Sequence, residues 1–138
     1  MLKKNMSLII WMLFVALIVF MPVRTQAAEE TSVTFQLSDD GQSYIVSGCE
    51  TSATGAIAIP AEYNGKPVTE IGNNAFQFCY YLTDITIPDT VISIGTSAFS
   101  DCHKLTSIVI PDSVTSIGSM AFCGCSQLSN VTLPKGIT

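Results

Sequence analysis

Apolar and polar positions repeat along residues 57–138 with a period of 23 residues. Seven positions carry the same residue type in three successive units, and each unit ends in an alternating apolar triplet followed by proline. The repeated positions are Val68, Val91 and Val114; Ile71, Ile94 and Ile117; Gly72, Gly95 and Gly118; Ala75, Ala98 and Ala121; Phe76, Phe99 and Phe122; Cys79, Cys102 and Cys125; Leu82, Leu105 and Leu128. A fixed period of about 20–50 residues is typical of a solenoid, in which each unit forms one coil.

Each unit contains two short segments with strand character. Ile85 and Ile87 alternate with Thr86, which predicts a strand whose isoleucines face inward while Thr86 faces out. Pro88 is expected to end that strand, because proline has no N–H to donate to a neighbour. Residues 91–94 are short and rich in β-branched side chains, which favours a second strand in the same coil.

The rest of the unit predicts a corner and a short helix. Gly95 is expected to form a sharp corner, since glycine adopts backbone conformations that other residues resist. Thr96 would then cap a helix, and Ala98, Phe99 and Cys102 would share one face of it. The predicted fold class is therefore an α/β solenoid, a stack of coils with parallel β-strands and one short helix per 23-residue coil.

A single coil cannot bury its own apolar side, so the coils are expected to stack and share one core. At the spacing of neighbouring strands, about 4.8 Å, equivalent residues would form columns. Isoleucines would lie on isoleucines, and one column would contain the three repeated phenylalanines, Phe76, Phe99 and Phe122.

The first coil carries an insertion. Pro60 and Val68 are eight positions apart where Pro88 and Val91 are three apart, so the insertion is 8 − 3 = 5 residues long. The Asn64-Gly65 pair predicts a turn at the centre of this surface loop. Three aromatic residues at the following corner are expected to pack partly beneath the loop: Phe78, Tyr80 and Tyr81.

The two ends of the array differ. Residues 28–56 lack the repeat, and two alternating segments at 33–37 and 44–46, separated by a turn with Gly41, predict a β-hairpin that caps the first coil. Residues 134–138 match the start of a fourth unit. The final strand would then expose an apolar edge. We expect either a fragment of a longer array or self-association through that uncapped C-terminal coil.

Residues 1–27 have the layout of a secretory signal peptide. Lys3 and Lys4 precede an apolar run at 8–21, and small residues precede an expected cleavage after Ala27. The alternative is a retained signal anchor, for which the eighteen positions of 6–23 are marginal against the about 20 that a span needs. The sequence thus predicts a signal peptide at 1–27, a hairpin cap at 28–56 and a repeat solenoid at 57–138, with three full repeats and the start of a fourth and no membrane span after cleavage.

Cleavage would make the chain more acidic. The whole chain has 6 − 11 = −5 charges, and residues 1–27 hold three basic residues and no acidic one, so the mature chain carries 3 − 11 = −8. Nucleic acid and anionic membrane surfaces are bound through clustered Lys and Arg. A nucleic-acid partner is therefore not expected.

The cysteines predict neither a metal site nor a cofactor site. Cys79, Cys102 and Cys125 share one repeat position and are expected to be small buried core residues. Cys123 and Cys125 form a Cys-x-Cys pair, but no second pair or histidine lies at zinc-finger spacing. Export would permit a disulfide, with Cys49 or Cys123 the expected participant, and the odd count of five leaves at least one thiol free.

Catalysis is not expected either. His103 is the single histidine and follows Cys102 directly, and adjacent side chains rarely face each other, so we expect a solvated corner residue. Acidic residues are scattered on turns instead of being paired for acid–base chemistry, and no serine-elbow or phosphate-loop motif is present. The sequence predicts a protein that is not an enzyme.

The pattern Val-x-x-Ile-Gly-x-x-Ala-Phe-x-x-Cys-x-x-Leu-x-x-Ile-x-Ile-Pro resembles the BspA-type leucine-rich repeat of bacterial surface proteins, over residues 57–138. The resemblance implies a secreted or cell-surface protein that mediates adhesion by binding an extracellular protein or cell-surface ligand. The alternative is a structural stalk or spacer within a longer surface protein. The candidate binding surface consists of the outward strand positions. These are Asp84, Thr86, Ser107, Val109, Asn130 and Thr132. Their small side chains, without Trp, Tyr or Arg, favour weak contact over one tight pocket.

Overall fold

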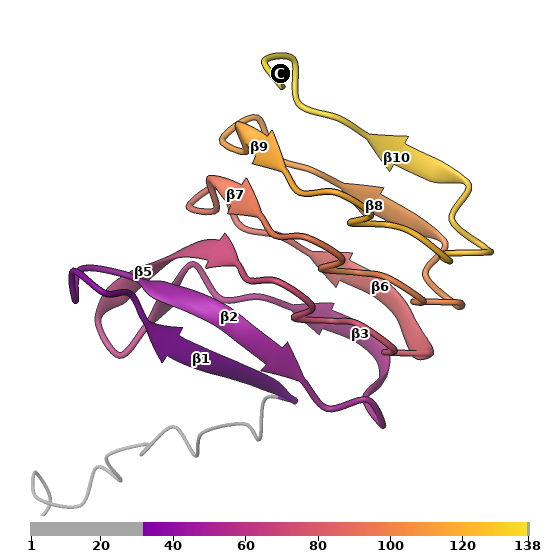
Figure 1. Cartoon of the computed structure of the whole chain (residues 1–138), viewed down its shortest axis with the longest axis horizontal. Coiled ribbons are helices and arrows are strands. Elements are labelled where there is room, and N and C mark those ends of the chain that lie inside the picture. The colour runs from indigo at the N-terminus through magenta and orange to yellow at the C-terminus, as the bar shows by residue number, and fades with distance from the viewer. Residues whose placement is uncertain (1–31, 138) are drawn as a thin grey trace, which may run out of the picture. The chain divides into compact units, whose positions relative to one another are not determined.

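The computed structural model describes residues 32–137, and the expected signal peptide lies outside them. The described strands stack in two columns, β1, β2, β5, β7 and β9 in one and β3, β6, β8 and β10 in the other (Figure 1). Their bounds are β1 Val33–Leu37, β2 Tyr44–Cys49, β3 Thr54–Ala58, β4 Glu62–Tyr63, β5 Lys66–Ile71, β6 Tyr81–Thr86, β7 Ser93–Ile94, β8 Ser107–Val109, β9 Ser116–Ile117 and β10 Asn130–Thr132. Within residues 32–137, no helix is long and apolar enough to cross a membrane.

The two alternating segments before the repeat form a hairpin that adds to the first column of strands. β1 and β2 pair antiparallel, and β2 then pairs parallel with β5, so that Val46 lies beside Ile71. β5, β7 and β9 continue the parallel ladder. In the second column β3 pairs with β6, and β8 pairs with β10. The parallel strands of the predicted solenoid are present.

The predicted short helix is wrong, because no helix forms in residues 32–137. Where a helix was expected, alternate N–H groups donate to carbonyl oxygens of the next coil instead of to their own turn. These bonds join Asn74 to Thr96 (3.0 Å), Phe76 to Ala98 (2.7 Å), Phe78 to Ser100 (3.0 Å), Ser97 to Ser119 (2.9 Å), Phe99 to Ala121 (2.8 Å) and Asp101 to Cys123 (2.7 Å). The segment is thus a third ladder between coils, and a helix would leave these bonds unmade.

The backbone of this ladder alternates between turns that a helix does not contain. The N–H of Gln77 donates to Asn74 O at 3.0 Å and that of Cys79 donates to Phe76 O at 3.1 Å, both three residues apart. Two residues per coil are left-handed, with φ values between 53° and 75°. They are Asn74 and Phe78, Ser97 and Asp101, and Met120 and Gly124. A right-handed helix cannot contain such residues.

The repeated glycines are explained by close approach between coils and not by a special backbone angle. A Cβ added at Gly95 would lie 2.6 Å from Asn73 N, and one at Gly118 would lie 2.4 Å from Thr96 N. Neither φ lies in the left-handed region, so the predicted reason for these glycines is wrong. Thr96, which was predicted to cap a helix, does not do so because no helix follows it. Its N–H instead donates to the Asn73 side chain of the preceding coil at 2.8 Å.

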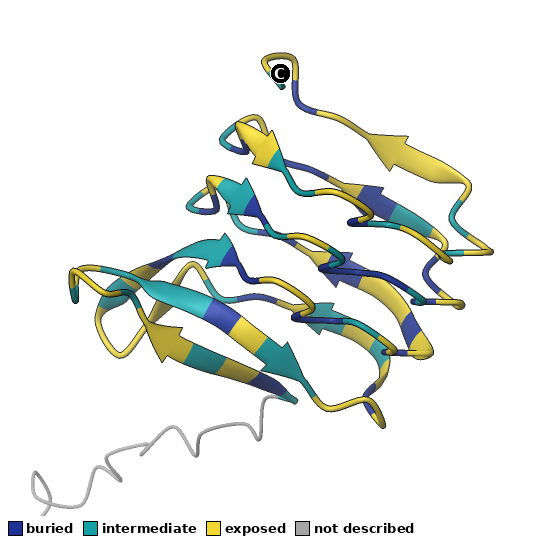
Figure 2. Cartoon of the chain, viewed as in Figure 1, coloured by how far each residue is buried: buried dark blue, intermediate teal, exposed yellow. Residues whose placement is uncertain are grey.

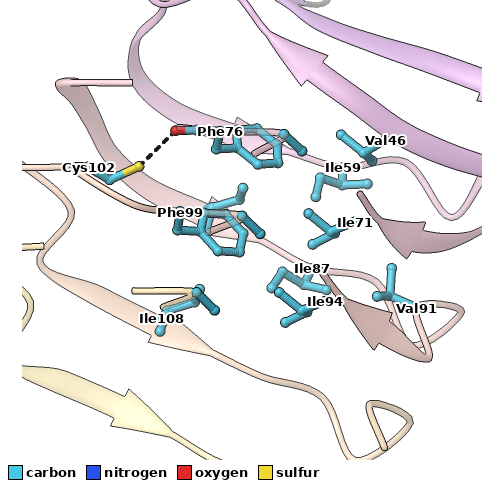
Figure 3. Packing of buried hydrophobic residues seen from close by; sticks show 14 of the residues in the cluster. Val46, Ile59, Ile71, Phe76, Ile87, Val91, Ile94, Phe99, Cys102 and Ile108 are labelled. Atoms are coloured by element: carbon cyan, nitrogen blue, oxygen red, sulfur yellow. Dashed lines mark hydrogen bonds between the residues drawn. The ribbon is translucent and has the colours of Figure 1, made fainter. Parts of the chain in front are cut away.

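The core consists of the repeated apolar residues in columns, as predicted (Figure 3). Phe76 and Phe99 are fully buried, with ring centroids 5.1 Å apart and planes 7° apart. Phe99 and Phe122 continue the stack at 5.4 Å and 3°. Parallel rings at this spacing combine burial with an aromatic contact on both faces of Phe99.

The insertion in the first coil is a second small hairpin. β4 pairs antiparallel with β5, and Asn64 and Gly65 between them have φ values of 49° and 75°. Two left-handed residues suit a tight two-residue hairpin turn, which agrees with the predicted Asn-Gly turn. At the end of β4, the Tyr63 ring stacks on Phe35 (4.3 Å) and meets Tyr44 edge-on (5.0 Å), so this loop packs on the β1–β2 hairpin.

Candidate binding surface

The strands β3, β6, β8 and β10 present one outward face, on which the six predicted contact residues lie. Five of the six are exposed and Ser107 is half-buried. Figure 2 shows β10 exposed along its whole length. The parallel register sets Ser107 beside Asn130 and Val109 beside Thr132. Val109 is the one apolar side chain among the six residues and is 63% exposed. The face is thus a set of short polar and β-branched side chains.

An aromatic corner adjoins this face at the start of β6. We use the name for Phe78, Tyr80 and Tyr81, whose exposed fractions are 42%, 41% and 50%. The rings of Phe78 and Tyr80 lie 5.9 Å apart. The prediction that these rings pack beneath the insertion loop is not met, because that loop packs its Tyr63 on the hairpin instead. The corner remains open to solvent.

The second coil adds charged groups to the same corner. The Tyr80 ring lies 5.1 Å from the His103 ring, and Lys104 Nζ lies 5.0 Å from the centre of the Tyr81 ring. His103 Nε2 lies 3.7 Å from Asp101 Oδ1. A cation over a tyrosine face is weakly attractive and orients both groups. The predicted solvated position of His103 is confirmed, since its side chain is 50% exposed.

At Phe78 the left-handed backbone of the repeat carries a bulky residue poorly suited to it. Its φ is 63°, in the left-handed region that non-glycine residues adopt at a cost of about 1–2 kcal/mol. The equivalent residues of the next two coils are Asp101 (φ 61°) and Gly124 (φ 75°), which tolerate this conformation better. An exposed phenylalanine in a strained conformation contributes little to folding, so its presence needs another explanation.

The sequence contains a signal for this corner that the repeat alignment hides. At the three corner positions the first coil has Phe, Tyr and Tyr, the second has Asp, His and Lys, and the third has Gly, Ser and Gln. These positions lie between the repeated residues, so they do not contribute to the 23-residue pattern. Comparison of the variable positions across coils finds them.

The comparisons with known proteins agree with this architecture. Residues 56–138, more than half of the chain, match the family described as the BspA type leucine rich repeat region (6 copies). The chain belongs to the BspA-type leucine-rich-repeat family. The predicted family resemblance is thereby confirmed.

Solved structures resemble this BspA-type chain as well. A leucine rich cell surface protein from Faecalibacterium prausnitzii is 33% identical, with a TM-score of 0.61, and the match covers 72% of this chain and 28% of that one. A leucine-rich repeat protein from Bacteroides ovatus is 27% identical, with a TM-score of 0.49, over 75% of this chain and 40% of that one. This chain thus spans less than half of either relative. No curated protein matches it.

The cysteines of the BspA-type repeat form a column inside the array. Cys79 and Cys102 are buried and Cys125 is half-buried, broadly as predicted for core residues. The Cys102 thiol donates to Phe76 O at 3.1 Å (Figure 3), and the Cys125 thiol donates to Phe99 O at 3.0 Å. Each thiol thus bonds to the backbone of the preceding coil. A hydrogen bond between the Cys102 and Cys125 side chains raises the pKa of Cys102, and burial raises it further, while the same bond lowers the pKa of Cys125.

The residues that the sequence raised as candidates for chemistry are not brought together in the described part of the chain. Cys102 points into the core and His103 into solvent, so the two do not form a reactive pair. Among residues 32–137, no group of three or more His, Cys, Asp or Glu side chains could hold a metal ion. The surface that remains is the outward strand face together with the aromatic corner.

Proposed function

We propose that this chain is an exported, cell-surface binding module that is not an enzyme and that holds an extracellular protein ligand on the outward strand face and the aromatic corner. The domain division that goes with it is a signal peptide at 1–27, a cap at 28–56 and a binding solenoid at 57–138. Support for the location comes from the family and from the 33% identical relative, which is described as a leucine rich cell surface protein.

The observation that carries the proposal is the exposed Phe78 in a left-handed backbone conformation. The residue has a strained backbone and leaves 42% of its surface exposed, so part of its apolar ring is available for contact. Exposed aromatic residues are the side chains that dominate protein–protein contacts, because a rigid ring buries much area at little entropic cost. A binding role gives this residue a function that stability does not.

A protein ligand fits the shape and charge better than other ligands. Tyr81 begins β6, and Asp84 and Thr86 follow on the same strand with exposed side chains, so the corner and the strand face adjoin along β6. Such a surface suits a macromolecule, whereas small molecules are bound in concave pockets. The mature charge of 3 − 11 = −8 favours a ligand with a neutral or basic contact surface.

The third coil supplies a variant that tests the corner without disturbing the fold. The triple substitution Phe78→Gly, Tyr80→Ser and Tyr81→Gln places the residues of the third coil in the first. The matched control is Ile92→Thr, which removes an apolar residue that is 53% exposed on another face. Threonine occupies the equivalent positions in the neighbouring coils, at 69 and 115.

Binding of the mature chain to a panel of immobilised extracellular proteins is the measurement. We expect the triple variant to lose affinity at least about 30-fold for any protein that the wild type binds, as for loss of a hot spot. Its melting midpoint should stay at or above that of the wild type, since glycine relieves the strain at position 78. Unchanged affinity of the triple variant, or an equal loss in Ile92→Thr, would contradict the proposal and favour a structural spacer.

A further inference from the structure

Two of the five thiols, one in the cap and one in the first coil, meet at the junction between the hairpin and the solenoid. The Cys49 thiol donates to Glu50 O at 3.5 Å, and the Cys79 thiol donates to the same oxygen at 3.9 Å. The two thiols also shift each other's pKa, which agrees with side chains that lie close together. Cys49 is the last residue of β2, whereas Cys79 belongs to the buried cysteine column.

We propose that Cys49 and Cys79 are a modification site, at which oxidation forms a disulfide that fastens the N-terminal hairpin to the first coil. The predicted participant Cys49 thus has a partner, and that partner is a repeat cysteine that the sequence assigned only to the core. The other predicted participant, Cys123, is exposed and lies two coils away from this junction.

Backbone bonds that do not involve the sulfurs hold the hairpin against the first coil: β2 pairs with β5, and the Gly72 N–H donates to Val46 O at 2.9 Å. Cys79 bonds to the carbonyl of Glu50 just as Cys102 bonds to that of Phe76 and Cys125 to that of Phe99, always 26 or 29 positions earlier. The hairpin therefore takes the place of a preceding coil, at the strand spacing of about 4.8 Å. A disulfide requires the two sulfurs to approach each other, and both thiols lie against the same Glu50 oxygen.

The two thiols differ in ways that suit stepwise oxidation. Cys49 is half-exposed and Cys79 is buried, so an oxidant reaches Cys49 first. The hydrogen bond from Cys49 lowers the pKa of Cys79, against the opposing effect of burial, and the same bond raises the pKa of Cys49. The order of reaction thus follows exposure, with Cys49 first and Cys79 second.

The oxidant is a disulfide of low molecular mass or of a thiol oxidoreductase. The Cys49 thiolate attacks one sulfur of that disulfide and releases the first thiol, which leaves a mixed disulfide on Cys49. The Cys79 thiolate then attacks the Cys49 sulfur and releases the second thiol. One external disulfide is reduced to two thiols, and the two protein thiols are oxidised to one disulfide.

Such a bond would be conditional on where the chain resides. Thiols stay reduced in the cytoplasm and oxidise outside it, so the hairpin would be fastened only after export. For its biological setting the inference rests on the proposed export, but the reaction itself does not, because the purified chain can be oxidised in solution. A failure of export and a failure of the thiols to pair are therefore distinguishable.

The test is oxidation of the purified mature chain with oxidised glutathione, followed by alkylation, digestion and mass spectrometry. We expect a cross-linked peptide pair containing Cys49 and Cys79, about 2 Da lighter than the sum of the two reduced peptides. Reduction should lower the melting midpoint of the oxidised chain by about 10–25 °C, as for loss of a loop-closing disulfide. Cys49→Ser should abolish the response to reductant, and the matched control Cys123→Ser should retain it.

Two results would overturn the proposal. One is full alkylation of both Cys49 and Cys79 after prolonged oxidation under conditions in which the circular dichroism spectrum stays native. The other is a cross-link from Cys79 to Cys102, its neighbour in the column, in place of Cys49.

Discussion

Truncation of Phe99 to alanine should remove the centre of the aromatic column. The ring is fully buried, with Phe76 on one face at 5.1 Å and Phe122 on the other at 5.4 Å. A buried aromatic side chain of about 150–250 Å² contributes about 4–6 kcal/mol at 25 cal/mol per Å². Measured phenylalanine truncations of about 3–5 kcal/mol agree with that value. We therefore expect Phe99→Ala to lower the free energy of unfolding by about 4 kcal/mol.

The matched control is Phe78→Ala, which removes the same atoms from the aromatic corner. Phe78 is 42% exposed, and alanine would occupy the same left-handed backbone, so strain is unchanged. A loss of about 1 kcal/mol is expected for such a partly exposed site.

Urea unfolding followed by circular dichroism measures both losses. With a slope of about 2 kcal/mol per molar, Phe99→Ala should shift the midpoint by about 2 M and Phe78→Ala by about 0.5 M. Equal midpoints for the two variants would refute the assignment of one ring to the core and the other to the surface.

Three further predictions follow from the coils and their ends. Gly95→Ala should destabilise the fold by about 2–4 kcal/mol, because its Cβ would meet Asn73 N at 2.6 Å and push two coils apart. The control Gly136→Ala has open space around it and should be nearly neutral. Thermal melts of the two variants measure the difference. Export of the full chain should yield a protein that begins at Ala28, which intact mass will show; recovery of the uncleaved chain in membranes would contradict the signal peptide. The mature chain should self-associate as its concentration rises, because among the described strands β10 pairs with β8 alone, and Val131 and the neighbouring Leu133 are 45% and 55% exposed. Sedimentation should detect this, and one added consensus coil should suppress it; a monomer at every concentration would argue against an adhesive edge.

The sequence alone was enough to predict the stack of coils, because the repeated residues are the ones that face the core. Ile71 and Ile94 recur at a fixed step, and their exposed fractions are 0% and 2%. A fixed period indicates that the coils stack, and stacking is enough to predict that these side chains are buried. The Asn64-Gly65 turn was predictable for a different reason, since its chemistry is local.

The helix prediction failed because it considered one coil in isolation. Ala98, Phe99 and Cys102 do share a face at helical spacing, but the N–H of Phe99 donates to Ala121 in the next coil. Bonds between coils depend on the neighbour and leave no trace in the local pattern. Of the six left-handed residues in this ladder only Gly124 is a glycine, so composition gives no warning of the turns.

The predicted contact face was only partly predictable for a related reason. Outward strand positions follow from alternation, and Thr86 and Val109 are indeed exposed. Tyr80 and Tyr81 lie at positions that do not repeat, and whether they are covered depends on where the insertion loop packs. That placement is decided by the contact of Tyr63 with Phe35, which connects segments that the repeat pattern does not relate.

The ladder between coils has an evolutionary consequence. Each coil presents to the next the same set of donors and acceptors that it receives from the one before, so a duplication or deletion of 23 codons leaves every remaining interface intact. The length of the array can therefore change in single genetic steps without passing through an unfolded intermediate. The three corner positions do not contribute to the core, so substitutions there leave the stacking of the coils unchanged. Each added coil can therefore acquire its own set of surface contacts.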